Sequence, residues 1–363
     1  MRRQNMRRFA RRSREVVLRD SASLPVLLVG IFMLVAVGTK EDESNPEDRI
    51  FAGVSGDYRE VNYGVHGVAG VYPIRIKYFD NPDYHGPPVV FVHGMGTSDA
   101  YFWRVHGEVE VFAGFIYSEQ RNVSAVGHAQ GLVDLGYDVV TYTYPDSRNR
   151  PLEYQAYDLS RILLWTKERF LTRDVILAGH STGGLICRYY IESGQPGREN
   201  YRFPYKEKSE YNWDGYLSIS DFEMKRLRYR YDVAKLVLIG TPNYGSLKEE
   251  GRDYGSPALF EMKESSDLIN WLEEGRRRAA EKGYKRPPVY VFVGKAYENY
   301  MGEGPLDFGD GIVTVSSAAG PFGDDENAEV FYYDLDHFEL AMDGAVLAKM
   351  YTVLRRDEAE PPS

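Results

Sequence analysis

The chain has 363 residues, of which 43% are apolar and 14% aromatic, and its formal net charge is −10 at pH 7. This composition excludes a disordered chain and allows a substantial buried core, in one large domain or in two. An acidic body is a poor binder of nucleic acid, and the single cysteine, Cys187, excludes an intrachain disulfide.

The first 38 residues differ from the rest of the chain. They carry eight arginines against one glutamate and one aspartate, and an uncharged run of 15 residues extends from Leu24 to Gly38. That length is short for a spanning helix and typical of an export signal, but the apolar run continues up to the small residues where a peptidase would cut. Residues 1–38 are therefore predicted to be a signal peptide or a membrane anchor that associates with the membrane through residues 24–38, unless the start is misplaced. Either of the first two alternatives makes the body extracytoplasmic, secreted or membrane-anchored.

Residues 39–60 are polar, contain Gly, Pro and acidic residues, and are predicted to be a linker. Beyond them, Ile74–Tyr78 alternates apolar with basic residues, which favours a half-buried edge strand.

Six continuous apolar runs follow along the chain, separated by helical stretches. They occupy residues 89–92, 139–142, 175–178, 236–239, 289–293 and 330–333. Strands that are apolar on both faces are typical of a parallel sheet covered by helices on each side. Residues 152–171 predict one of these helices, because their apolar side chains recur at helical spacing. The fold class is therefore α/β, with a mostly parallel sheet and helices on both faces.

Two segments are too long to be simple connections. Residues 192–232 are polar but rich in aromatic side chains, and residues 243–288 carry apolar side chains at helical intervals. Each is a candidate cap above the sheet edge, the alternative being that its aromatic residues only attach it to the body. The prediction is one domain over residues 61–355 with these two insertions, followed by a polar tail at 356–363.

The most informative motif is the sequence GHSTG at residues 179–183, which follows a strand-like run and precedes a helix-like stretch. This order is the pattern of a nucleophile elbow, a tight turn that raises a serine hydroxyl above the edge of a sheet. The serine backbone is strained there, so the residues two before and two after it need to be small. Ser181 is therefore the predicted nucleophile, and the alternative is an ordinary glycine-rich turn.

A serine nucleophile needs a base to accept its proton and an acid to orient that base. Of the seven histidines, only His337 follows the last apolar run, where the chain order Ser, Asp, His requires the base. Asp310, between two glycines in the loop after the fifth run, is the predicted acid. Asp307, Asp324 and Asp325 compete with it, although each is also a common turn residue.

An oxyanion hole needs two backbone N–H donors. Thr182, directly after the nucleophile, is expected to supply one of them. Met95 is expected to supply the other from the turn His93–Gly96, which ends the first apolar run and has a plain strand-ending turn as its alternative.

These motifs together resemble a lipase-type α/β-hydrolase over roughly residues 70–355. The HGMG turn at 93–96 resembles the oxyanion turn of bacterial lipases, GHSTGG at 179–184 their elbow, and DGIV at 310–313 their acid turn. TPNYGS at 241–246 is similar to a segment shared by lipases, lecithin–cholesterol-acyltransferase-like enzymes and GPI inositol-deacylase-like enzymes. The resemblance implies the α/β-hydrolase fold and acyl-ester chemistry through an acyl-serine, with no organic cofactor. Two departures are the long 192–232 insertion and the lack of a clear lipase-type calcium site, for which only Glu339 and Asp343 are faint candidates.

The expected function is therefore that of a serine esterase or lipase acting on an acyl ester or lipid substrate. A lipid acyltransferase or a phospholipase would use the same three residues, because the cap and the pocket choose the acceptor. A non-catalytic binding module usually lacks the nucleophile or the base, and a dehalogenase-type hydrolase needs an acidic residue at position 181.

Overall fold

The computed structural model describes the parts of the chain that belong to one compact unit, Val35–Ser363. The described residues are 56–67, 70–95, 97–112, 118–144, 147, 150–196, 199–200, 227–246, 257–299 and 307–356. The predicted signal or anchor, most of the predicted linker, the greater part of the 192–232 insertion and nearly all of the predicted tail lie outside them. None of the described helices is both long enough and apolar enough to cross a membrane.

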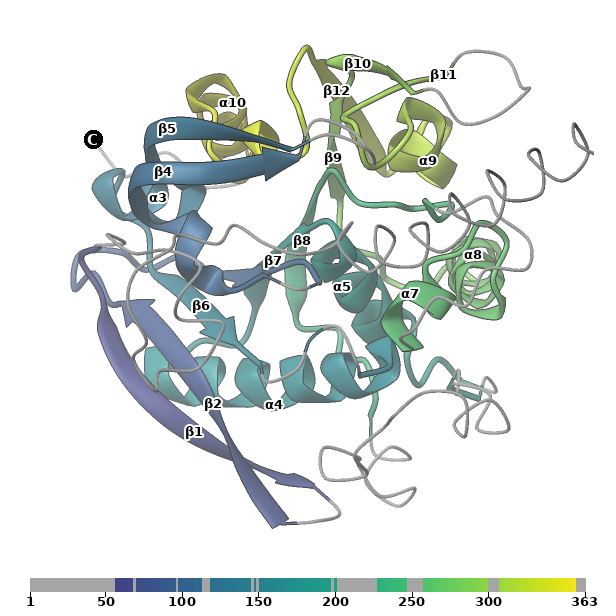
Figure 1. Ribbon diagram of the computed structural model, residues 1–363. Helices are drawn as coiled ribbons and strands as arrows, with labels where there is room; N and C mark the ends of the chain where they lie inside the picture. Colours follow the sequence, from purple (N-terminus) through teal and green to yellow (C-terminus); the bar gives the residue numbers. More distant parts are fainter. Residues whose placement is uncertain are drawn as a thin grey trace, which may run out of the picture. The chain divides into compact units, whose positions relative to one another are not determined.

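An eight-stranded sheet forms the centre of this unit (Figure 1). In spatial order its strands are β1 (Arg59–Gly67), β2 (Gly70–Phe79), β6 (Val139–Thr143), β3 (Val89–Val92), β7 (Val175–His180), β8 (Val233–Ile239), β9 (Val289–Gly294) and β12 (Ala328–Tyr333). The contacts of β2 with β1 and β6 are antiparallel, and all pairs from β6 to β12 are parallel. Each of the six apolar runs is one of the parallel strands, so the predicted α/β class is confirmed.

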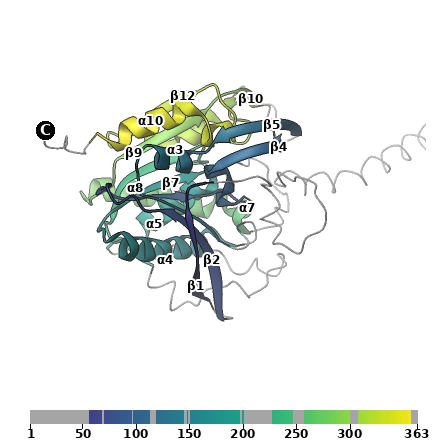
Figure 2. The same ribbon diagram turned by 90° about the vertical axis from the view of Figure 1, so that its left-hand side faces the viewer.

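Helices cover both faces of the sheet (Figures 1 and 2). The main ones are α3 (His128–Asp134), α4 (Leu152–Phe170), α5 (Thr182–Glu192), α8 (Asp267–Glu281) and α10 (Gly344–Leu354). On one face α3 and α10 share a buried core with the strand residues Phe91, Ile239 and Phe292. On the other face α5 contacts both α4 and α8. Strands β3, β6, β7 and β9 are buried along their whole length, so their apolar residues need no alternation, whereas β12 at the edge of the sheet is only half-buried.

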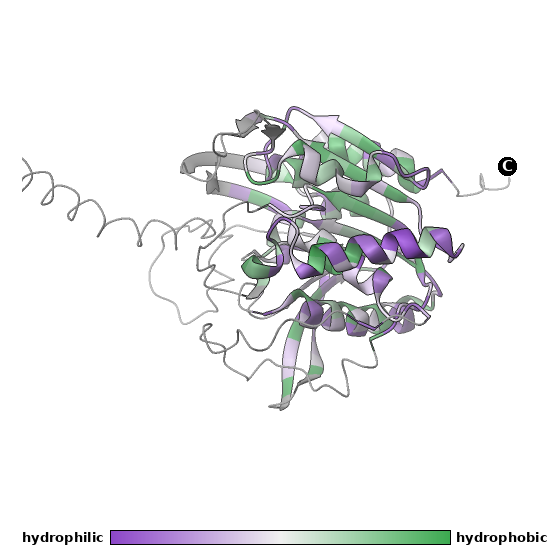
Figure 3. Ribbon diagram, turned by 90° about the vertical axis from the view of Figure 1, so that its right-hand side faces the viewer, coloured by the Kyte–Doolittle hydropathy of each residue, from purple (hydrophilic) through white to green (hydrophobic). Residues whose placement is uncertain are grey.

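Helix α8 shows how part of the 243–288 segment is used. The Ser266 hydroxyl caps it by accepting a hydrogen bond from the Ile269 N–H at 3.2 Å. Its apolar side, including Leu268 and Leu272, is buried, whereas polar residues line its outer side (Figure 3). Because α8 connects the parallel strands β8 and β9, this part of the segment is a crossover helix that covers the sheet. A cap function for the rest stays a prediction, since residues 247–256 lie outside the described ranges.

The expectation of an edge strand over Ile74–Tyr78 is wrong. That stretch belongs to β2, and β1 pairs along its outer side and begins at Arg59, inside the predicted linker. Lys77 is buried, and its ammonium group lies 3.5 Å from the Asp99 carboxylate and 4.9 Å from the centre of the Tyr58 ring. A buried cation with a partner produces the same alternating pattern as a solvent-facing one, and the sequence alone does not distinguish them.

Two hairpins outside the main sheet were not predicted. In the first, β4 (Arg104–Phe112) pairs with β5 (Ser118–Val126), next to α3 (Figure 2). In the second, β10 (Tyr297–Asn299) pairs with β11 (Asp307–Gly309), so that a short ribbon separates β9 from the predicted acid.

Candidate active site

Strand β7 leads directly into Ser181, and α5 begins at the next residue. Ser181 has φ 55° and ψ −130°, a conformation that is strained for any residue with a side chain. Its N–H donates to the Ile239 carbonyl at 2.9 Å, and its own carbonyl accepts from the Gly184 N–H at 3.0 Å. These bonds hold the strand-to-helix turn that the sequence predicts, with Ser181 half-buried at the edge of the sheet.

Glycine is required on both sides of this turn. A Cβ at Gly179 would lie 2.5 Å from the Gly184 nitrogen, and one at Gly183 would lie 2.1 Å from the Val92 carbonyl oxygen. These separations are too short for any side chain. The turn is therefore packed backbone against backbone, both onto the start of α5 and onto the end of β3.

The predicted acid and base are joined by a short hydrogen bond. His337 Nδ1 lies 2.6 Å from Asp310 Oδ2, and both side chains are buried. The other carboxylate oxygen, Oδ1, accepts from the N–H groups of Ile312 at 2.9 Å and Val313 at 2.7 Å. The His337 N–H also donates to the Asp310 carbonyl at 3.0 Å. The imidazole is thus oriented through its Nδ1 atom.

The competing aspartates have other surroundings. Asp325 accepts hydrogen bonds from Arg276 and Arg286, each at 2.8 Å; burial alone would raise the pKa of its carboxyl, but these guanidinium groups hold that pKa below its usual range. Asp324 is exposed, and the side chain of Asp307 lies outside the described residues. Among the described aspartates of this loop, only Asp310 meets His337.

The end of β8 and the residue after it connect the two halves of the site. The carbonyl of Ile239, the last residue of β8, accepts the Ser181 N–H, and the next residue, Gly240, has φ +53° and lies against the Asp310–His337 pair. A Cβ at Gly240 would be 3.1 Å from Asp310 Oδ2 and 3.2 Å from His337 Nδ1. Gly240 was not predicted as a site residue; the signal that could have identified it is a glycine directly after the apolar run at 236–239.

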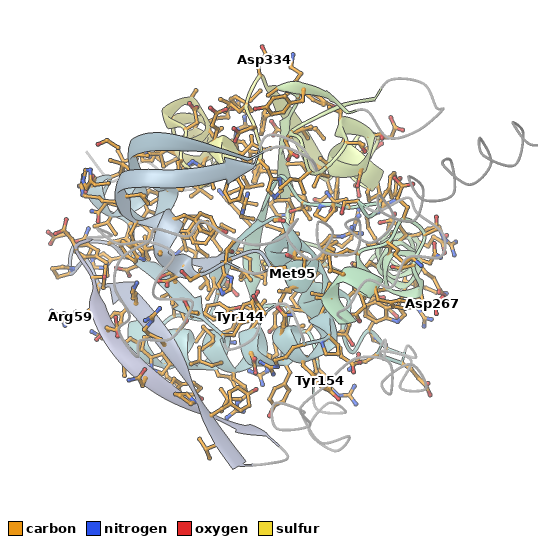
Figure 4. The ribbon with its side chains drawn as sticks, in the orientation of Figure 1. Arg59, Met95, Tyr144, Tyr154, Asp267 and Asp334 are labelled. Carbon is orange, nitrogen blue, oxygen red and sulfur yellow. The ribbon has the colours of Figure 1, made fainter. Side chains whose placement is uncertain are left out.

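The two predicted oxyanion donors lie next to each other. The Met95 N–H (Met95 is labelled in Figure 4) donates to the Thr182 hydroxyl at 2.6 Å, and both residues are buried. Gly94 packs on Ser181, because a Cβ there would lie 2.9 Å from Ser181 Cβ. The Met95 N–H is bound to the Thr182 hydroxyl in this structure, so the predicted role as an oxyanion donor requires that this bond be shared or released.

The TPNYGS segment connects the helix after Ser181 with the helix after Asp310. Arg188 of α5 donates from Nη1 to the backbone and the side-chain oxygens of Asn243, at 3.0 Å each. The Asn243 amide donates in turn to the Ala318 carbonyl at 2.7 Å, in α9 (Val315–Ala319). Asn243 thereby links α5, which begins directly after Ser181, to α9, which follows Asp310, a role that was not predicted from the sequence.

The faint calcium candidates act as backbone caps. Glu339 Oε2 accepts from the Asp336 N–H at 3.0 Å, and Asp343 Oδ1 accepts from the Ala345 and Val346 N–H groups at the start of α10. Within the described part of the chain, no three His, Cys, Asp or Glu side chains gather as they would around a metal ion.

The chain belongs to the alpha/beta hydrolase family, whose sequence profile matches residues 89–308. The matched span begins at β3 and contains Met95, Ser181 and Thr182, but it ends before Asp310 and His337. A search of curated proteins found no match.

Solved structures with similar folds include several lipases and esterases. The lipase BlEst2 of Bacillus licheniformis is 14% identical, with a TM-score of 0.44 over 77% of this chain and 97% of that one. The esterase Pf2001 of Pyrococcus furiosus is 13% identical, with a TM-score of 0.45 over 89% and 99% of the two chains. Lipase B of Aspergillus fumigatus is 12% identical, with a TM-score of 0.46 over 77% and 56%. These similarities are distant, and the family assignment rests on the sequence match.

Proposed function

We propose that the protein is a serine hydrolase that cleaves carboxylic, lipid-like esters through an acyl-serine intermediate. The observation that carries this proposal is the buried Asp310–His337 pair, which is joined by a 2.6 Å bond. The pair lies against Gly240, and the residue before Gly240, Ile239, accepts the Ser181 N–H. A buried imidazole aligned by a carboxylate beside a strained serine is the arrangement that serine hydrolysis requires.

In the proposed reaction, Ser181 Oγ attacks the ester carbonyl and transfers its proton to His337 Nε2. Asp310 stabilises the imidazolium that forms, and the N–H groups of Met95 and Thr182 bind the oxyanion. His337 then protonates the departing alcohol as the acyl-serine forms. Water, deprotonated by the same imidazole, hydrolyses the acyl-serine and regenerates Ser181.

The lipid-like substrate class comes from the resemblance of the four motifs to those of lipases. If an alcohol replaces water in the second half of the reaction, the same acyl-serine makes the protein an acyltransferase. If the ester belongs to a phospholipid, the protein is a phospholipase. Both alternatives keep the roles of Ser181, Asp310 and His337, so they are separated by substrate and product rather than by these residues.

The decisive test is to measure rates with acyl esters from acetyl to palmitoyl length, beside the Ser181→Ala variant. Ser124→Ala, which changes an exposed serine of β5, is the matched control. We expect Ser181→Ala to lose turnover and labelling by a fluorophosphonate, and Ser124→Ala to keep both. A preference for long chains supports a lipase and one for short chains an esterase. Equal rates in the wild type and Ser181→Ala would remove Ser181 as the nucleophile.

We also propose an extracytoplasmic location, secreted or membrane-anchored, which rests on the arginine-rich start and the uncharged run at residues 24–38. Cell fractionation with mass measurement of the mature N-terminus tests it. Recovery of the intact chain in the cytoplasm would contradict it.

A further inference from the structure

A buried chain of hydrogen bonds connects the turn after β3, the end of β7 and the segment that carries His337. The Gly94 N–H of the oxyanion turn donates to the Tyr101 hydroxyl at 3.3 Å, and that hydroxyl lies 2.9 Å from Nδ1 of His180. Nε2 of His180 lies 2.8 Å from the His337 carbonyl oxygen. Tyr101 and His180 are both only 1% exposed, so no solvent competes for these bonds.

The directions of these bonds follow from the groups involved. The His337 carbonyl only accepts, so Nε2 of His180 carries a hydrogen and donates it. A neutral imidazole then has Nδ1 as its acceptor, and the Tyr101 O–H donates to it while the Tyr101 oxygen accepts from Gly94. Burial first, and the neighbouring His337 second, hold the pKa of His180 well below its ordinary value, in keeping with a neutral ring.

The backbone of His337 is held from two sides by this arrangement. Its N–H donates to the Asp310 carbonyl, and its carbonyl accepts from His180. The His180 and His337 rings are also in contact, with centroids 4.7 Å apart. His180 is part of the elbow itself, one residue before Ser181. The base is therefore attached directly to the strand that ends in the nucleophile.

Tyr101 is itself fixed by a buried polar cluster. It lies in a short helix, η2 (Asp99–Phe102), whose Asp99 carboxylate accepts from the hydroxyls of Thr141 and Thr143 at 2.7 Å each. Burial alone would raise the pKa of Asp99, but Lys77 and the two hydroxyls lower it below its usual range. An ionised carboxylate with satisfied oxygens anchors η2 to β6, and thus holds the Tyr101 hydroxyl at His180.

We propose that His180 and Tyr101 are positioning residues that hold His337 in register with the Ser181 elbow and the oxyanion turn. This proposal rests on the proposed function, because it gives these residues a purpose in the reaction. It goes beyond that function by assigning a role to the variable second position of the GHSTG motif and to a tyrosine outside every motif.

Three substitutions test the proposal, and a fourth is the control. His180→Leu removes the donor to the His337 carbonyl, whereas His180→Gln keeps an amide N–H at a similar reach. Tyr101→Phe removes the hydroxyl that donates to Nδ1 of His180 and accepts from the Gly94 N–H. Tyr142→Phe is the matched control, because Tyr142 is fully buried and its hydroxyl has no hydrogen-bond partner among the described residues.

We expect His180→Leu to lower kcat about 10- to 100-fold with KM within about twofold, since misplacing a reacting group by up to 1 Å has that effect. Tyr101→Phe should lower kcat less, His180→Gln should restore most of the loss, and Tyr142→Phe should match the wild type. The proposal is overturned if His180→Leu and Tyr101→Phe keep wild-type kcat, or if Tyr142→Phe loses as much as Tyr101→Phe.

A spectroscopic measurement separates this proposal from the proposed function. The Nδ1 proton of His337, shared with Asp310 across 2.6 Å, should give a low-field proton resonance that needs no substrate. We expect it to shift or broaden in Tyr101→Phe and to stay unchanged in Tyr142→Phe; an unchanged signal in both would overturn the positioning role. A wild type that shows this resonance but is not labelled by a fluorophosphonate at Ser181 would instead defeat the proposed function. If His180→Leu does not fold, Tyr101→Phe carries the test.

Discussion

Gly240→Ala is a small change that should affect the acid–base pair directly. Gly240 has φ +53°, so an alanine there is strained by about 1 kcal/mol. The added methyl group would also lie 3.1 Å from Asp310 Oδ2 and 3.2 Å from His337 Nδ1, the two atoms that share the 2.6 Å bond. Either the ring or the carboxylate must then move by a few tenths of an ångström.

The structure offers a control with the same strain and no neighbour. Gly283, just after the end of α8, has φ +66°, and a Cβ there meets nothing within 4 Å. Gly283→Ala should therefore lower the free energy of unfolding by about 1 kcal/mol and leave turnover unchanged. Gly240→Ala should lower that free energy by about 1–2 kcal/mol and kcat by about tenfold, because small misplacements of a reacting group have large effects on rate.

The assay is urea unfolding of both variants beside steady-state hydrolysis of the preferred ester. The ratio of the two kcat values isolates the contact with the pair from the backbone strain. If Gly240→Ala keeps the kcat of Gly283→Ala, the Asp310–His337 pair does not depend on the space that Gly240 leaves. That result would refute the proposed effect of Gly240 on the pair.

Three further predictions concern the acid, a buried histidine and the cysteine. Asp310→Asn should lower kcat about a thousandfold or more by misaligning the imidazole, whereas Asp324→Asn, at an exposed competitor, should not change it; equal losses would contradict the assignment. Burial lowers the pKa of His128 to about 4. Below pH 6.5 the His128 imidazole therefore binds a proton in the unfolded chain but not in the folded protein. The free energy of unfolding should decrease as the pH falls from about 6.5 to 4. In urea unfolding, the difference in unfolding free energy between the wild type and His128→Gln should therefore change by about 2 kcal/mol between pH 7 and 5, and parallel pH curves would speak against it. Cys187 is fully buried, which raises the pKa of its thiol, so it should react with a thiol reagent in urea but not in the native protein; rapid native labelling would show an open core.

Sequence patterns identified the features of this protein that depend on local chemistry. Most of the parallel strands were predictable because burial on both faces leaves a continuous apolar run, and the elbow because steric crowding at Gly179 and Gly183 demands glycine. The run at 330–333 is apolar as well, although its strand, β12, is a half-buried edge strand. His337 was selected by chain order alone, since it is the one histidine after the last apolar run. The structure places its Nδ1 2.6 Å from Asp310 Oδ2, and its role as the base stays a prediction.

Other features depend on contacts between residues that are remote in sequence, and no sequence pattern predicted them. Lys77 looked solvent-facing because its partner Asp99 belongs to another segment. Tyr101 is one of many tyrosines, and only the packed structure places its hydroxyl on His180. Asn243 lies within a motif, but its bonds to Arg188 of α5 and Ala318 of α9 depend on how these two helices are placed in the fold.

The hydrogen bonds of the site join segments from opposite parts of the chain. Gly94, His180 and His337 are brought together only when the strands between them have paired in the order given above. Contacts of such long sequence separation form late and together, because each closes a large loop. Recovery of turnover during refolding should therefore follow completion of the whole sheet, whereas helix signals recover earlier. If the protein has the proposed activity, the recovery of that activity during refolding should report the last cooperative step of folding.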